Sequence, residues 1–594
     1  MWKFLIPLIT VSSLTTPSIA VLPNVVNLEI ASVIRTAIAR VNKENAVMES
    51  RHFTGIDKDV TDFQTAEPIL FSESPLDVHE IEQESRAINW IASEINSRGL
   101  PFTPVEVIRH PDAVALNISC PFKTPLNCSV SKYRTIDGSC NNLNNPLLGM
   151  GFTPFPRELP ADYEQGPAGL RELPRTTSRD GSQLPGAREI SMRFHHLNKT
   201  ARYDSHLTFM FAIWGQFIAH DVTDRAPGKG DDRVTVYAGL TGMETLWFRE
   251  HNRLARLLAE ENPKWDDETL YQEARRLVIA LIQHVTYSEW LPLSLGSDVM
   301  NQYQLHLSDE GYFTGYDPSV DPSTTNEVAT AAFRFGHSLM RSNFNLVDKL
   351  YQPADGPPLR LEDMFFKSNI YLMHEQQFMR GTLVDASKDV SRIVTNALVN
   401  NLYQTRYGNG FDLPAFNIQR GRDHGLSPYN DFRDLFGLTV ASEFSTNSSS
   451  GFSDMSPHTV EILQQIYSDP DDVDVWTGGV SERPLPGAAV GPLFANMLGW
   501  QFFKYRYGDR FWYETNATPQ AFTLEQLSEI RNATLAHLLC RNLELDTIQP
   551  RVFEKHTAPG ELTVKANWWK KLWKSLKMVK TNRQYTLRKA KKLR

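Results

Sequence analysis

The stretch WGQFIAHD, residues 214–221, decides the fold together with the later stretch FRFGH, residues 333–337. In the first stretch, Gln216 and His220 stand four residues apart in an apolar helical pattern, so they lie side by side on one helix face. An amide and an imidazole placed in this way can face one ligand together. Most single histidines are structural, but this pairing makes both residues candidates for catalysis.

In FRFGH, Arg334 precedes His337 by three residues and shares its helical face. A neutral imidazole at position 337 is able to ligate a metal, and a guanidinium at position 334 is able to hold a carboxylate of a cofactor bound there. The two residues together predict a cofactor site.

A third stretch, DLPAFNIQRGRDHG at residues 412–425, is too rich in amides and charges to fill a core. One interpretation is a structural network of salt bridges, which suits Arg422, Asp423 and His424. That interpretation suits Asn417 less well, so Asn417 is a further candidate for the site.

Helical patterns dominate the chain from residue 207 onward, and alternating strand patterns are scarce. The predicted fold class is therefore mainly α, with little β structure. There is no internal repeat, which excludes solenoids and propellers. The predicted helices span Leu207–His220, Leu240–Glu260, Asp267–Glu289, Asn326–Met340, Ser391–Tyr403, Pro457–Tyr467, Gly491–Tyr507 and Leu524–Cys540.

The N-terminus indicates the secretory route. Residues 1–20 join a basic start, a short apolar stretch and small residues, which is typical of a signal peptide. Residues 21–118 are acidic and weakly helical, and we interpret them as a pro-segment or a helical preface. Six glycosylation sequons support a secreted, extracellular protein. They begin at Asn117, Asn127, Asn198, Asn447, Asn516 and Asn532.

The charge is unevenly distributed. The 594 residues carry a formal net charge of −8, which is too mild for a nucleic-acid binder, and no nucleic-acid partner is expected. Residues 561–594 form a basic tail: from 565 onward there are twelve Lys or Arg and no acidic residue. Tryptophans recur there at helical spacing, which favours binding to an anionic membrane, glycan or matrix surface. The alternative is a solubilising tail whose tryptophans pack on the main domain.

From about Cys128 to Arg541 the chain resembles the animal haem peroxidases. The resemblance implies a single large helical haem-peroxidase domain, at residues 119–560. It rests on the three stretches above and on four more in the same order: YRTIDGSCNN (133–142), REHNR (249–253), WTGG (476–479) and GDRFW (508–512).

The resemblance also implies roles for the residues that bind the cofactor. His337 matches the proximal ligand of the haem iron, and Asn417 matches the residue that accepts its ring N–H. Arg334 and Arg420 match residues near the haem propionates.

On the opposite side, His220 matches the distal base, which moves a proton from one peroxide oxygen to the other. Arg233 matches the distal arginine that stabilises developing negative charge, and Gln216 matches a glutamine that binds water or a halide. The implied partners are hydrogen peroxide and a small electron donor: a phenol, a tyrosyl group or a halide.

The chain departs from the family between His220 and Arg233. Relatives have a long segment there with a calcium-binding loop, whereas here the two residues are thirteen positions apart. Thirteen residues span roughly 43 Å when extended, so both side chains still reach one haem. Asp221 matches one calcium ligand, but a calcium ion takes six to eight oxygens and the other ligands came from the missing loop. Calcium therefore stays an open question.

The haem attachment differs as well. The two carboxylates that form ester links in many relatives align with Ala219 and Val236, which cannot form esters, and the position of a third link aligns with Tyr237. We therefore expect non-covalent haem b.

The chain has four cysteines. Cys128 and Cys140 bracket a short loop, as a pair does in the family, and we expect a disulfide between them. Cys120 and Cys540 are then either paired with each other or free.

The leading hypothesis is a secreted haem peroxidase. The alternative is a peroxidase-derived extracellular matrix or adhesion protein whose catalysis is impaired by the missing segment. A third hypothesis is that the missing segment reflects exon skipping or a gene-model error.

Overall fold

The computed structural model of the chain describes residues 29–43, positions scattered between 87 and 113, and residues 126–151, 153–165, 171–196, 202–223, 232–404, 410–447, 449–543 and 548–555. These residues form two compact units. The first unit contains residues 29–43, the described positions between 87 and 113, and Gln165. The second unit contains the described residues between 126 and 164 and from 171 onward. The predicted leader at 1–20 and the basic tail at 561–594 lie outside the described residues.

The first unit contains a helix at residues 29–43. Its apolar side chains, such as Val33 and Ile34, are fully buried and cluster with Ile91. Arg98 ties the cluster's polar edge together, because its guanidinium bonds to Glu94 and to Ser32 and Thr36 of the helix.

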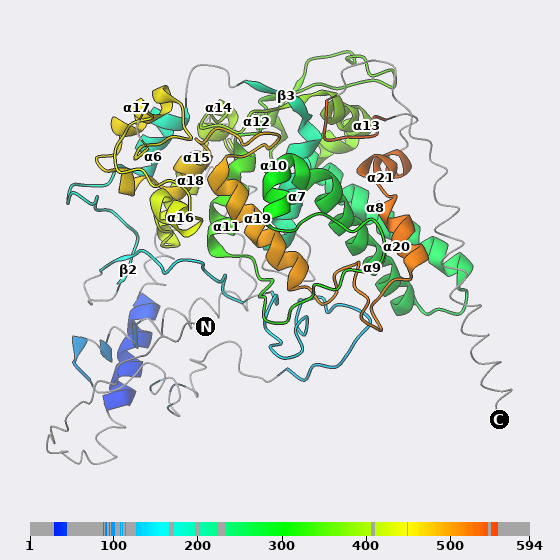
Figure 1. Cartoon of the computed structure of the whole chain (residues 1–594), viewed down its shortest axis with the longest axis horizontal. Helices are drawn as coiled ribbons and strands as arrows, with labels where there is room; N and C mark the ends of the chain where they lie inside the picture. The colour runs from blue at the N-terminus through cyan, green and yellow to red at the C-terminus, as the bar shows by residue number, and fades with distance from the viewer. Residues whose placement is uncertain are drawn as a thin grey trace, which may run out of the picture. The chain divides into compact units, whose positions relative to one another are not determined.

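The second unit is mainly helical, as the sequence predicts (Figure 1). Its α-helices are α6 (Ala187–Ile190), α7 (Phe209–Thr223), α8 (Ala238–Glu261), α9 (Asp267–Val285), α10 (Leu291–Gln302), α11 (Asn326–Thr330), α12 (Leu361–Met364), α13 (Ser368–Val384), α14 (Asn396–Val399), α15 (Leu413–Asp423), α16 (Tyr429–Leu435), α17 (Pro457–Gln464), α18 (Val475–Gly479), α19 (Pro492–Tyr507), α20 (Leu524–Arg531) and α21 (Leu535–Asn542).

Shorter turns of helix and short strands join these elements. The π-helical turns are η1 (Ser191–His195) and η3 (Thr286–Trp290), and the 3-10 turns are η2 (Asp232–Thr235), η4 (Ala332–His337) and η5 (Pro470–Asp472). The described strands form three two-stranded sheets: β1 (Glu164–Gln165) with β2 (Arg171–Leu173), β3 (Tyr203–Thr208) with β6 (Ala386–Lys388), and β4 (Asn343–Phe344) with β5 (Leu359–Arg360). β3 and β6 run antiparallel, with Tyr203 opposite Lys388.

Helix α7 lies in the core of this unit. Its side chains are apolar nearly all round, which is the pattern of a helix buried on every side. Trp214 lies 6.0 Å from Trp247 of α8 by ring centroids, and Phe217 stacks on the same ring at 6.2 Å. Because α7 carries Gln216 and His220, this packing fixes the candidate site inside the unit.

The helix predicted over Asn326–Met340 does not run through. α11 ends at Thr330, and Ala331 leaves the helical region with φ −125° and ψ −60°. The chain then continues as the 3-10 turn η4, which carries Arg334 and His337. A 3-10 helix has three residues per turn, so positions three apart stand directly above one another. The shared face of Arg334 and His337 therefore survives the break.

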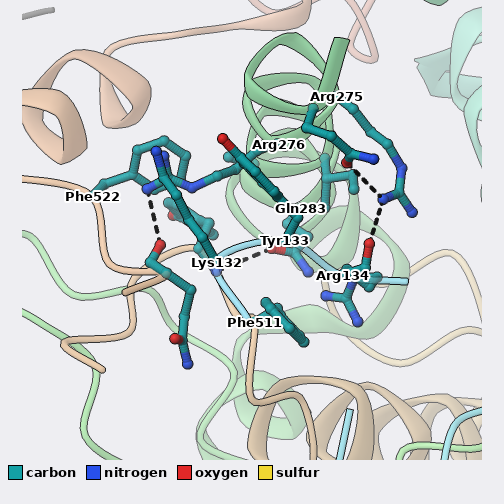
Figure 2. A pocket seen from close by; sticks show the side chains of 13 residues that line it. Lys132, Tyr133, Arg134, Arg275, Arg276, Gln283, Phe511 and Phe522 are labelled. Atoms are coloured by element: carbon teal, nitrogen blue, oxygen red, sulfur yellow. Dashed lines mark hydrogen bonds between the residues drawn. The ribbon is translucent and has the colours of Figure 1, made fainter. Parts of the chain in front are cut away.

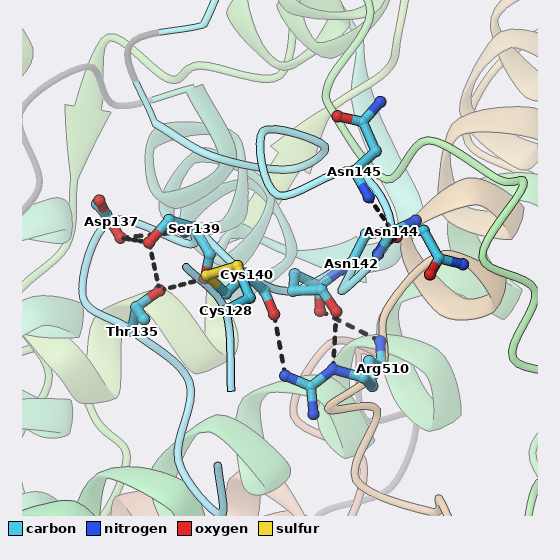
Figure 3. The surroundings of a disulfide bond; sticks show 10 residues. Cys128, Thr135, Asp137, Ser139, Cys140, Asn142, Asn144, Asn145 and Arg510 are labelled. Carbon is cyan, nitrogen blue, oxygen red and sulfur yellow. Dashed lines mark hydrogen bonds between the residues drawn. A yellow bond between two sulfur atoms is a disulfide. The ribbon is translucent and has the colours of Figure 1, made fainter. Parts of the chain in front are cut away.

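The disulfide Cys128–Cys140 is formed, as expected, with the two Cα atoms 5.5 Å apart. Figure 3 shows the loop docked against Arg510, whose guanidinium donates to the backbone carbonyls of Cys140 at 2.9 Å and Asn141 at 2.8 Å. Thus the disulfide loop is tied to the segment after α19. Cys540 is a buried thiol of α21, and Cys120 lies outside the described residues.

Among the described residues, no helix is both long enough and apolar enough to cross a membrane.

Candidate functional site

The first half of the site lies on α7. Gln216 Nε2 lies 3.5 Å from His220 Nε2, so the amide and the imidazole stand together as their spacing predicts. Most of α7 is buried, yet these two side chains are only partly so. Neither side chain is therefore fully absorbed into the packing of the core.

Arg233 reaches the same end of α7 in spite of the short connection. It lies on η2, and its Nη2 donates to the backbone carbonyl of His220 at 3.3 Å. One nitrogen of the guanidinium is thus bonded to the backbone of His220. Asp221, the next residue, is exposed. Within the described part of the chain, no group of three or more His, Cys, Asp or Glu side chains is placed to hold a metal ion.

The second half of the site joins η4 to α15. Asn417 is fully buried, and its Nδ2 lies 2.9 Å from His337 Nδ1. Its Oδ1 accepts a hydrogen bond from Arg334 Nη1 at 3.0 Å. Asn417 is held firmly because Asp412 caps α15: the Asp412 side chain accepts from the backbone N–H of Ala415 at 3.0 Å.

The direction of the Asn417 bond differs from the one that the resemblance implies. Here the amide N–H donates to His337 Nδ1, which leaves the ring proton on Nε2. The resemblance implies the reverse, with Nδ1–H donating to Oδ1 and Nε2 able to bind iron. The physical reason is Arg334, which occupies Oδ1 and so turns the NH₂ group toward the imidazole.

The imidazole of His337 is kept neutral. Burial, the positive charge of Arg334 and the charge of nearby His220 lower its pKa to about 3, and the bond to Asn417 opposes them only in part. A neutral imidazole has one lone pair, as a metal ligand must. With Asn417 donating to Nδ1 that lone pair faces Asn417, so binding iron through Nε2 requires the amide to turn and the ring proton to move to Nδ1. The charge of His220 acts on His337, so the two candidate histidines lie close enough to interact electrostatically.

Three guanidinium groups gather near His337. The pKa of Arg334 is lowered to about 10, mainly by burial and further by the charges of Arg420 and Arg233. Among the described residues, the hydrogen-bond acceptors of the Arg334 guanidinium are neutral: the Asn417 side chain and the carbonyl of Ala329. Such a cluster favours a dianion, and the two propionates of a haem supply two carboxylates. The residues present therefore fit a haem bound between His220 and His337.

An aromatic wall, which the sequence did not single out, stands beside Arg233. The ring of Tyr403 packs on Phe366 at 4.7 Å and on Phe365 at 5.2 Å between centroids. The backbone N–H of Phe366 bonds to the carbonyl of Val236, just after η2. Burial raises the pKa of Tyr403 to about 12, which the charge of Arg233 partly offsets. Only the apolar pair Phe365 and Phe366 hints at this wall in the sequence.

Tyr237, at the position of the third haem link in the resemblance, points into the core. Its hydroxyl is buried and has no hydrogen-bond partner among the described residues. Its ring lies 6.5 Å from that of Phe344.

The helical domain thus brings together two neighbouring histidines, a buried amide that contacts one of them, and three arginines that act on one another electrostatically. The family model for animal haem peroxidase matches residues 133–229 and 226–553, so the chain belongs to the animal haem peroxidases. The predicted family and the predicted fold class are both confirmed.

The similar proteins carry peroxidase names. The chain is 40% identical over 317 residues to peroxidasin of Drosophila melanogaster, covering 52% of this chain and 20% of that protein. It is 39% identical over 325 residues to chorion peroxidase of Aedes aegypti, covering 53% of this chain and 39% of that protein. The matched region is therefore less than half of either relative.

Solved structures agree on the fold. Peroxidase A from Dictyostelium discoideum superposes with a TM-score of 0.61 at 26% identity, covering 72% of this chain and all of that chain, 100%. The fatty acid alpha-dioxygenase of Oryza sativa superposes with a TM-score of 0.56 at 16% identity, covering 83% of this chain and 95% of that one. At that identity the likeness to the dioxygenase concerns the fold alone.

Proposed function

We propose that the protein is a secreted haem peroxidase that reduces hydrogen peroxide and oxidises small phenols, tyrosyl groups or halides. The observation that carries this proposal is the chain of contacts His337–Asn417–Arg334, whose histidine also feels the charge of His220 in the pair Gln216–His220. A structural histidine needs no second histidine near it and no cluster of cations beside it.

His337 would hold the iron of haem b, and Arg334 and Arg420 would hold its propionates. Haem supplies the redox centre that takes up the oxidising equivalents of the peroxide. Asn417 fixes the orientation of the His337 ring from behind, and such outer partners commonly change affinity or activity by about 10- to 100-fold when mutated. With Ala219 and Val236 unable to form esters, the haem would be extractable by acid acetone.

His220 would take a proton from one oxygen of hydrogen peroxide and return it to the other, so that water leaves. Gln216, whose Nε2 lies 3.5 Å from His220 Nε2, would hold a water molecule or a halide beside the imidazole. Arg233 would add positive charge where negative charge develops. The aromatic wall of Phe365, Phe366 and Tyr403 offers a surface on which the ring of a phenol could pack.

One observation favours the alternative, a catalytically impaired matrix or adhesion protein. Arg233 Nη2 donates to the backbone carbonyl of His220 at 3.3 Å, so this N–H is not available to a bound peroxide. If Arg233 stays there with haem bound, haem uptake would be normal and peroxide turnover slow.

Secretion rests on the leader and the sequons. Four of the six sequon asparagines are described, and all four are exposed: Asn127, Asn447, Asn516 and Asn532. Each is thus accessible to glycan transfer.

The test is expression of the full chain with haem, followed by the Soret band and by guaiacol and iodide oxidation with peroxide. His337→Ala should abolish the band. His220→Ala should keep it and lose turnover by at least about 100-fold. His458→Ala, at a side chain that is 71% exposed, is the matched control and should change neither. No band in the parent chain would overturn the proposal, and a band without turnover would favour the impaired protein.

A further inference from the structure

A second cavity lies away from the histidines and shares none of the residues of the candidate site. It is bounded by residues 132–134, one face of α9 and residues 511–522, and it holds about 410 Å³ of space, part of it open to solvent. Figure 2 shows Arg275 and Arg276 on the α9 side and Phe511 on the opposite side, with Lys132 and Tyr133 between them.

The walls of this cavity are flat. The Arg276 guanidinium lies over the Phe522 ring at 3.7 Å from its centroid, and the Arg134 guanidinium lies over the Phe511 ring at 5.2 Å. The rings of Tyr133 and Tyr513 also line it. Aromatic rings and guanidinium planes both favour stacking with a planar ring.

The cations on one side of the cavity are already matched by a carboxylate. Glu273 accepts from Lys132 and, at 3.1 Å, from Arg276, and it also accepts from the Tyr133 hydroxyl at 2.7 Å. Burial raises the pKa of Tyr133, the charge of Arg276 opposes the shift, and the nearby charges of Asp266 and Glu268 add to it. This end has little reason to attract an anion.

The other side has an excess of positive charge. Both oxygens of Asp509 accept from a single nitrogen of Arg134, Nη2, at 2.9 and 2.7 Å. Neither Nε nor Nη1 of Arg134 has an acceptor among the described residues. Arg275 has no described carboxylate partner: it donates to the backbone carbonyls of Arg134 and Thr135 and, at 3.4 Å, to the Gln272 amide.

The two guanidinium groups also act on each other. Burial lowers the pKa of Arg275 most and the charge of Arg134 lowers it further, whereas the charges of Tyr271 and Asp221 oppose the shift. Two neighbouring cations with unused N–H groups form a site that a carboxylate would bridge, since guanidinium groups bind carboxylates with more than one bond.

We propose that this cavity binds a small aromatic carboxylate, with its ring packed between the aromatic walls and its carboxylate on Arg134 and Arg275. Tight binding at this cavity requires both the aromatic ring and the carboxylate of the ligand. An aliphatic anion would leave the rings uncovered, and an uncharged ring would leave the N–H groups unused.

The test is isothermal titration of the full chain with three probes: 4-hydroxybenzoate, 4-hydroxybenzamide and acetate. We expect saturable one-to-one binding of the first and binding at least tenfold weaker of the other two. Arg275→Gln should weaken 4-hydroxybenzoate at least tenfold, whereas Arg256→Gln, at an exposed arginine of α8, should not. Equal binding of 4-hydroxybenzamide would overturn the proposal.

Two further variants keep the result interpretable. His337→Ala separates this cavity from the haem site, because it should leave 4-hydroxybenzoate binding unchanged even if the proposed peroxidase activity fails. Binding lost in His337→Ala but kept in Arg275→Gln would place the probe at the haem site and refute the inference. If Arg275→Gln lowers the unfolding temperature, Phe522→Leu provides a second wall variant, and unchanged binding in both would also refute it.

Discussion

Replacing Asn417 by leucine should remove the hydrogen bonds by which its amide joins His337 and Arg334. Asn417 is fully buried, donates toward His337 Nδ1 at 2.9 Å and accepts from Arg334 Nη1 at 3.0 Å. Leucine has a similar size and no polar atom, so two buried polar groups lose a partner. Each such loss costs about 1–3 kcal/mol, which gives a decrease of about 2–6 kcal/mol in the free energy of unfolding.

The same change should weaken haem binding about 10- to 100-fold, as loss of an outer partner of a metal ligand does. Urea unfolding of the haem-free protein measures the first effect, and titration with haem followed at the Soret band measures the second. Asn496→Leu is the matched control. Asn496 is 7% exposed and is bonded through Nδ2 to the Pro492 carbonyl at 2.9 Å, away from both histidines. The Asn496→Leu variant should have a lower free energy of unfolding and an unchanged affinity for haem.

Asn417→Asp sharpens the prediction. A carboxylate only accepts, so it would keep Arg334 and accept the N–H of His337 Nδ1, which leaves Nε2 for the iron. Haem affinity should therefore be retained in Asn417→Asp and lost in Asn417→Leu. Equal affinity in both variants, or an equal loss in Asn496→Leu, would refute the role given to the amide.

Three other outcomes are expected. Removing the disulfide with Cys128→Ser should lower the free energy of unfolding by about 3 kcal/mol in a denaturant titration, because the closed loop spans 12 positions; no change would mean that the Arg510 contacts alone hold the loop. Burial raises the pKa of Glu289 to about 8, against the bond from the Leu535 N–H. The folded protein then binds a proton on the Glu289 carboxyl more tightly than the unfolded chain does. The free energy of unfolding should therefore fall as pH rises from about 4.5 to 8, by at most about 1.4 kcal/mol per pKa unit. Glu289→Gln should flatten that slope in melting curves, and an unchanged slope would exclude Glu289 as its source. Finally, removing residues 565–594 should abolish binding to anionic vesicles in a sedimentation assay, and equal binding without them would contradict a surface-binding tail.

Local patterns were enough to predict one half of the site. The spacing of Gln216 and His220 sets their contact because both lie on one unbroken helix, and helical neighbours follow from sequence spacing alone. The disulfide Cys128–Cys140 was likewise expected from the resemblance and is present.

The other half depends on contacts between distant segments. Asn417 meets His337 across 80 positions of sequence, and the direction of their bond is decided by Arg334, which competes for the same amide. Nor does the sequence reveal that the helix breaks at Ala331, because the apolar pattern runs on through the break. The aromatic wall beside Arg233 is also tertiary: Tyr403 meets Phe366 through packing that no local period encodes.

The position of Arg233 is set by packing in the core and does not depend on the length of the chain that connects it to His220. Arg233 lies on η2, five residues before the start of α8, and α8 is anchored to α7 by its Trp247 ring, which packs on Trp214 and Phe217. Burial of large aromatic side chains is worth several times the hydrogen bond that Arg233 makes. The docking of α8 on α7 therefore brings Arg233 to His220 whatever the length of the connection. The contact between Arg233 and His220 thus follows from the packing of the core.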